Sequence, residues 1–177
     1  MKEIELYGDG IGKVSYVQHV GNDKMIANAA RVSFGNDNTK PFTKRDEKLV
    51  KYLIEHKHTS PFEHNSITFL FEVPMFVRSQ HMRHRTWAYN EISRRYTEVD
   101  MNFYLPKEFR TQHKSNRQNL YAKYYGTVNL GNLLKFVDLR IHEGAQWEIQ
   151  KVAEACLDIA TEIWPFSVGA YREIRGA

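Results

Sequence analysis

The side chains best suited to chemistry lie between residues 80 and 97, where basic groups are mixed with hydrogen-bonding ones. An arginine presents a planar fork of N–H donors that matches the oxygen atoms of phosphate and carboxylate groups. Amide, hydroxyl and carboxyl groups beside it add further hydrogen bonds. The pattern therefore predicts a site for a phosphorylated, hydrogen-bonding ligand. Its residues are Gln80, Arg83, His84, Arg85, Asn90, Glu91, Ser93, Arg94 and Arg95.

Two other interpretations of this stretch are open. A run of charges often marks a solvated loop, but plain loops seldom contain as many aromatic residues as Trp87, Tyr89 and Tyr96. The stretch could also belong to a small nucleic-acid-binding module, in which Trp87 and Tyr89 stack on bases while the arginines bind phosphates.

Composition narrows the class of protein. The chain has 177 residues, 42% of them hydrophobic and 26% charged, which is typical of one soluble domain with its own core. A net charge of +4 suits an anionic ligand but is too small to require nucleic acid. The single cysteine, Cys156, excludes a disulfide framework and a cysteine-based zinc site. We find no signal peptide and no membrane span, so we expect a cytoplasmic protein.

Hydrophobic periodicity, capping residues and turns predict an α+β fold, with helices packed on a small mixed or antiparallel sheet. Two short strands flank a turn at Asp9-Gly10, and a third strand buries Ile67, Phe69 and Phe71. Helices are expected at residues 23–32, 43–56, 74–82, 127–140 and 144–164.

Three of these helices carry more specific expectations. The second should bury one face, and Pro74 should lie in the first turn of the third. Pro165 should end the last helix, whose apolar face includes Cys156 as an inert thiol. The expected buried face of the second helix is Leu49, Tyr52, Leu53 and His56.

The stretch before the fourth helix, residues 101–127, has a weak apolar pattern. Its polar and basic part, 111–118, favours a surface loop, from which Arg110 and Arg117 could reach a phosphate.

Residues 56–64 read His-Lys-His-Thr-Ser-Pro-Phe-Glu-His and raise the question of a metal site. His56 and His58 are two residues apart and do not share a helical face, and Pro61 interrupts the segment. Because the H-E-x-x-H spacing is absent, we predict no metal here.

The segment Arg83-His84-Arg85, followed seven residues later by Ser93, resembles the signature of the flavin-dependent thymidylate synthases. Three further blocks are similar to that family in the same order. These blocks are residues 29–34, 58–64 and 129–149.

The resemblance implies a single domain over residues 1–177 that methylates dUMP to dTMP. Methylenetetrahydrofolate would give the carbon, and NADPH would reduce FAD, which carries the hydride. It also implies a homotetramer with active sites between subunits.

The resemblance assigns roles to individual residues. Arg140 would be catalytic, since a cation beside the pyrimidine favours its ionised ring and activates its carbon; the alternative is a helix-end cation that satisfies carbonyl groups. Ser93 would bind rather than act as a nucleophile, because no base partner is evident. The flavin would contact Ser33, Ser60, Glu63, Arg83, His84, Arg85, Asn129 and Lys135. The substrates would contact His58, Gln80, Arg83, Glu91, Ser93, Arg94, Arg95 and Arg140.

Three departures from the family pattern stand out. The segment near residues 105–125 is shortened, and the missing stretch normally supplies a nucleotide-binding arginine. Gly131 and Lys135 replace an arginine and an asparagine that contact flavin in relatives, and Gly144 replaces a histidine. The shortened segment leaves open a degenerate relative that binds nucleotide without turnover.

Overall fold

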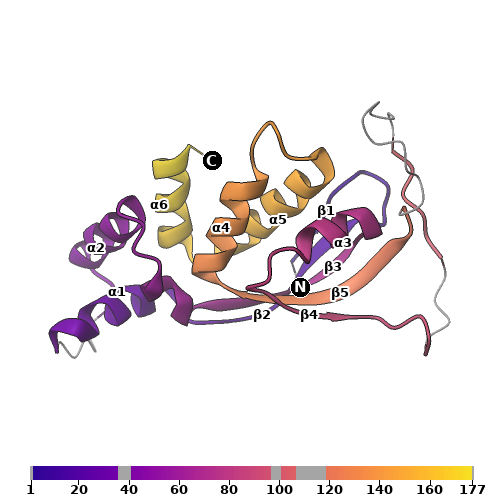
Figure 1. Ribbon diagram of the computed structural model, residues 1–177. Helices are drawn as coiled ribbons and strands as arrows, with labels where there is room; N and C mark the ends of the chain where they lie inside the picture. Colours follow the sequence, from indigo (N-terminus) through magenta and orange to yellow (C-terminus); the bar gives the residue numbers. More distant parts are fainter. Residues whose placement is uncertain (1, 36–40, 97–100, 107–118, 177) are drawn as a thin grey trace.

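The computed structural model describes residues 2–35, 41–96, 101–106 and 119–176. Its sheet has five antiparallel strands in the order β1-β2-β3-β5-β4. Helices α4, α5 and α6 lie over one face of this sheet, while α1 and α2 lie at one end (Figure 1). The predicted α+β class is therefore confirmed, and the sheet is antiparallel rather than mixed. The strands are β1 (Glu3–Glu5), β2 (Lys13–Val20), β3 (Ser66–Pro74), β4 (Ala88–Glu91) and β5 (Tyr121–Asn129).

Six α-helices and two 3₁₀ turns complete the described parts of the chain. Asn22 caps the first helix by accepting a hydrogen bond from the backbone N–H of Met25, as expected for a polar N-cap. The helical elements are α1 (Asp23–Arg31), η1 (Val32–Phe34), α2 (Lys44–Glu55), η2 (Ser60–His64), α3 (Met75–His81), α4 (Leu130–Arg140), α5 (Trp147–Ile163) and α6 (Pro165–Arg175).

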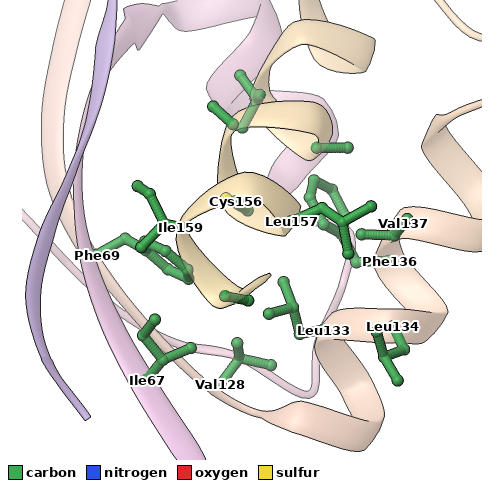
Figure 2. Close-up of a cluster of buried hydrophobic side chains, with 14 of the residues drawn as sticks. Ile67, Phe69, Val128, Leu133, Leu134, Phe136, Val137, Cys156, Leu157 and Ile159 are labelled. Atoms are coloured by element: carbon green, nitrogen blue, oxygen red, sulfur yellow. The ribbon is translucent and has the colours of Figure 1, made fainter. Parts of the chain in front are cut away.

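Strand β3 lies at the centre of the sheet, between β2 and β5. Its alternating residues Ile67, Phe69 and Phe71 are buried, as their spacing predicts. Figure 2 shows Ile67 and Phe69 converging with side chains from β5, α4 and α5. Cys156 of α5 lies in this cluster, and burial raises the pKa of its thiol well above the ordinary value, so the thiol is inert.

The expectation for residues 101–127 is wrong at its C-terminal end, because residues 121–129 form the long strand β5. The predicted helix at 127–140 accordingly begins only at Leu130. Tyr121 and Tyr124 are buried in β5 although tyrosine is only moderately apolar. Gly126 is needed there, because a Cβ atom would lie 2.8 Å from Cε2 of Phe71. Arg110 and Arg117 lie outside the described residues.

Other boundaries also differ from expectation. Pro165 ends α5 but is also the first residue of α6, where its fixed φ suits a first helical turn. Pro74 is the N-cap of α3 rather than part of its first turn.

The sequence pattern also missed the short strand β4. In α2 the buried residues are Asp46, Val50, Leu53 and Ile54, whereas Tyr52 and His56 are exposed.

The carboxylate of Asp46 connects α1 to α2 although its side chain is fully buried. It accepts hydrogen bonds from the backbone N–H and the hydroxyl of Thr43, from Lys24 Nζ at 3.2 Å and from Arg31. Burial alone would raise the pKa of Asp46, but these donors outweigh burial and lower the pKa to about 2.

We predict that Asp46→Asn lowers the free energy of unfolding by about 2 kcal/mol at pH 7, because the native state favours the ionised carboxylate. A lowered pKa stabilises the fold above the unfolded-state pKa, so this contribution should vanish as pH falls from about 4 to about 2. Urea unfolding of both proteins across this pH range checks both statements. Glu47→Gln in the same helix is the control, and equal loss in the two variants would contradict the prediction.

Candidate active site

The arginine-rich segment is fixed to the core by its aromatic residues. Trp87 is only 5% exposed and packs against Phe71, His81 and Phe136, with ring centroids 4.4 to 6.1 Å away. The hydroxyl of Tyr89 donates to the carbonyl oxygen of His81 at 2.8 Å. The segment is therefore a folded part of the molecule, and the solvated-loop interpretation is wrong for its first half.

Polar groups lie at the surface above these buried rings. They come from α3, from β4 and from the residues between and after these two elements. Arg83, Arg85 and Arg95 are exposed. The guanidinium of Arg94 donates to the carbonyl oxygen of Tyr121 at 2.8 Å, which ties the end of the segment to β5. The exposed arginines leave most of their N–H donors available for an anionic ligand.

Glu91 and Ser93 both have partners within the chain. Glu91 forms an ion pair with Arg78 of α3, and Ser93 Oγ accepts a hydrogen bond from the backbone N–H of Arg95 at 3.3 Å. Sequence reasoning missed Arg78, because nothing in the spacing indicates that a helix residue meets a strand residue across the site.

Arg140, the last residue of α4, contacts the arginine-rich segment through His84. Its Nε donates to Nε2 of His84 at 3.0 Å, so the Nε2 atom must be unprotonated and Nδ1 must hold the imidazole hydrogen. Burial, and secondly the charge of Arg140, lower the pKa of His84 to about 4. Arg140 is thus held by a neutral imidazole rather than by helix carbonyl groups, and its four Nη hydrogens remain for a ligand.

Gln80 is also oriented by a residue far away in the sequence. Its side-chain amide donates to the amide oxygen of Gln146, the N-cap of α5. The two residues are separated by 66 positions, so no local pattern could have predicted the pair.

A second group of predicted residues gathers at the N-terminus of α4. Asn129 caps this helix by accepting from the backbone N–H of Asn132 at 2.9 Å. A Cβ atom on Gly131 would lie 3.3 Å from the carbonyl oxygen of Thr59 and 3.7 Å from Cγ of Glu63, so η2 passes close to the helix. Ser60 and Glu63 are therefore near Asn129, with exposed side chains.

The two groups lie at opposite ends of α4. A helix of 11 residues spans about 16 Å, so a single chain keeps Asn129 well apart from Arg140. Ser33 lies in η1 with an exposed side chain, and no described contact joins it to either group. Lys135 is exposed on the middle of α4, and His58 is exposed just before η2.

The described residues contain neither a membrane-spanning helix nor a cluster of metal ligands. None of their helices is long and apolar enough to cross a membrane. In the same part of the chain, no three histidine, cysteine or acidic side chains gather closely enough to hold a metal ion.

Comparison with known proteins gives a consistent result. A family model described as thymidylate synthase complementing protein matches residues 15–124 and 117–166. The chain belongs to this family. A flavin-dependent thymidylate synthase of Thermus thermophilus is 34% identical over 92% of the chain and 76% of its own length. One from Thermotoga neapolitana is 34% identical over 90% of both chains.

Two solved structures also match. The crystal structure of the UMP/dUMP methylase PolB from Streptomyces cacaoi, bound with 5-Br dUMP, has a TM-score of 0.82 at 27% identity. The match covers 96% of this chain and 97% of PolB, so the two chains are nearly equal in length. A second PolB structure, bound with 5-Br UMP, has a TM-score of 0.76 at 28% identity.

We predict that the imidazole of His84 titrates near pH 4, and that Arg140→Ala raises this midpoint without restoring the ordinary value, since burial is the larger cause. Histidine ring proton shifts measured by NMR across pH check both statements. Lys135→Ala, in the same helix, is the control and should leave the midpoint unchanged. A midpoint near 6.5 in the unmodified protein would show that Arg140 is not held in this way.

Proposed function

We propose that this protein is an FAD-dependent thymidylate synthase that methylates dUMP to dTMP with methylenetetrahydrofolate and NADPH. The observation that carries the proposal is the Arg140–His84 pair beside the exposed arginines, in a chain of this family. The names of relatives about a third identical to this chain support the same activity.

The residues present suit these ligands. Arg83, Arg94 and Arg95 would bind the phosphate of dUMP, while Gln80, Glu91 and Ser93 would form hydrogen bonds to its ring and sugar. Arg140 would place its Nη groups at the pyrimidine, where a cation stabilises negative charge that develops on the ring. His84 would keep that guanidinium in position, because a neutral Nε2 can accept its Nε hydrogen.

The flavin would lie against residues from both ends of α4. Arg83, His84 and Arg85 would contact it from one group, and Ser60, Glu63 and Asn129 from the other, with Ser33 adding a contact from η1. The exposure of these side chains and the close approach of η2 to Gly131 fit a large ligand lying on the surface. Bound FAD would supply hydride transfer, which no side chain can perform.

A homotetramer with sites between subunits fits the separation of the two groups. Because about 16 Å lies between the ends of α4, a second chain can bring its own Asn129 group to the Arg140 group of the first. His58 would then face the folate or the nicotinamide. A cytoplasmic location stays our expectation, since an unpaired cysteine suits a reducing compartment.

Two alternatives lose support. A nucleic-acid-binding module would need Trp87 for stacking, but the ring is buried. A degenerate relative was suggested by the shortened middle segment, yet PolB, described as a methylase with a bound nucleotide, is nearly equal in length.

UMP is a second candidate substrate, and the specific observation for it is the similarity to PolB, which is described as a UMP/dUMP methylase. Turnover assays with UMP and dUMP at equal concentrations would decide between them.

We predict that the purified protein with added FAD gives a bound-flavin absorbance spectrum, and that dUMP perturbs it because both ligands share one site. An unchanged spectrum on adding dUMP would contradict the shared site, and absence of flavin binding would overturn the proposed function.

We predict that Arg140→Ala lowers kcat by about a hundredfold or more while flavin binding persists, since the cation acts on charge that forms during the reaction. Steady-state kinetics and flavin titration measure the two effects. Arg45→Ala removes an exposed arginine of α2 and should change neither. Normal turnover in the Arg140 variant would remove the catalytic assignment.

A further inference from the structure

A cavity of about 360 Å³ lies among the C-terminal end of α2, η2, α4 and α6. Its apolar lining is formed by Leu53, Ile54, Phe62 and Leu134, all of which are largely buried. A volume of this size with an apolar wall fits an aromatic ring rather than a chain of water molecules.

Positive charge is concentrated on the same cavity. Lys57, Lys135 and Arg175 line it, against a single carboxylate, Asp138. That carboxylate already accepts from the hydroxyl of Tyr171 at 2.7 Å and lies 3.7 Å from Arg175. Within the part of the chain that the structure describes, neither lysine has an ion pair, so the cavity has cations to offer an anionic group.

Lys57 has an unusual backbone conformation. Its φ is +56°, in the left-handed region that favours glycine, and it is the only non-glycine residue with positive φ among the described residues. Hydrogen bonds on either side hold it there: the Lys57 N–H donates to the Ile54 carbonyl at 3.1 Å and the His58 N–H to the Leu53 carbonyl at 2.8 Å. These two bonds are those of a Schellman motif that ends α2, and glycine would fit this position with less strain than lysine.

The cavity adjoins the Asn129 group of the candidate active site. His58, Thr59 and Gly131 line it, and Ser60 and Glu63 follow directly in η2. A ligand that contacts the flavin beside the Asn129 group could therefore extend its other end into this cavity.

We propose that this cavity binds the anionic tail of the second substrate, with an aromatic group on the apolar wall and the anion on Lys57, Lys135 and Arg175. This inference rests on the proposed function. Two substrates offer such chemistry: methylenetetrahydrofolate has a benzoyl ring joined to the two carboxylates of a glutamate, and NADPH has an adenosine 2′-phosphate.

The test is calorimetric binding of 5-formyltetrahydrofolate and of NADP⁺, neither of which needs turnover, to protein with FAD and dUMP. In Lys57→Gly the dissociation constant of one or both titrants should rise about fivefold to tenfold, the loss expected for one charged partner. A rise for the folate alone assigns the carboxylates, and a rise for NADP⁺ alone assigns the phosphate. Lys135→Ala should act on the same titrant.

Three controls make the result decisive. Lys48→Ala removes an exposed lysine elsewhere on α2 and should change neither constant. The melting temperature of Lys57→Gly should not fall, because glycine suits a φ of +56°. Weaker flavin binding in Lys57→Gly would assign the cavity to the flavin and overturn the inference.

Unchanged constants for both titrants, or no binding of either to the unmodified protein, would also overturn the inference. Failure of the proposed function is distinguishable, because it would appear as absent flavin binding in the unmodified protein. Folate or NADP⁺ binding that depends on Lys57 could still be measured in that case.

Discussion

The arrangement of the candidate site depends on the pairing of β3 with β5. The two strands are in register along their full length, from Ser66 opposite Asn129 to Pro74 opposite Tyr121. Because the pairing is antiparallel, the start of β3 lies beside the end of β5, and the backbone N–H of Leu130 donates to the carbonyl of Asn65 at 2.8 Å. Element η2, which precedes β3, is thereby placed against the first turn of α4, which follows β5. A slip of one residue would separate Ser60 and Glu63 from Asn129 and would turn the buried face of β5 outward.

Around the middle of β3 and β5, buried aromatic rings position the catalytic candidates. His81 is completely buried, accepts or donates a hydrogen bond to the hydroxyl of Tyr124 at 2.9 Å, and packs edge-on against Trp87. Burial lowers the pKa of His81 well below its ordinary value, so it stays neutral among these rings. Trp87 in turn fits only because Gly126 has no side chain. The candidate site residues are thus held in place by a layer of buried aromatic rings behind them.

These dependencies explain which features could be predicted from sequence. Strand β3 and helix α5 have strong periodic patterns of fully buried residues, and both were located correctly. Strand β5 was missed because Gly126, a poor strand former, occupies one of its inward positions and weakens the alternating pattern. The family resemblance identified Arg140 and Gln80, but their partners His84 and Gln146 are 56 and 66 positions away and meet only in the folded chain. Local spacing of residues predicts helices and strands. Side-chain pairs between distant residues depend on how those helices and strands pack in the folded chain.

The departures of this chain from its family can also be understood from the same register. With η2 so close to α4, a side chain at Gly131 would begin only 3.3 Å from the carbonyl oxygen of Thr59, which makes glycine the least strained residue there. An arginine at that position would need η2 to shift slightly away from α4. Lys135 lies about one turn further along α4 and faces the cavity that Lys57 also lines. The positive charge on this part of α4 therefore lies at the cavity wall rather than at the crowded first turn of the helix.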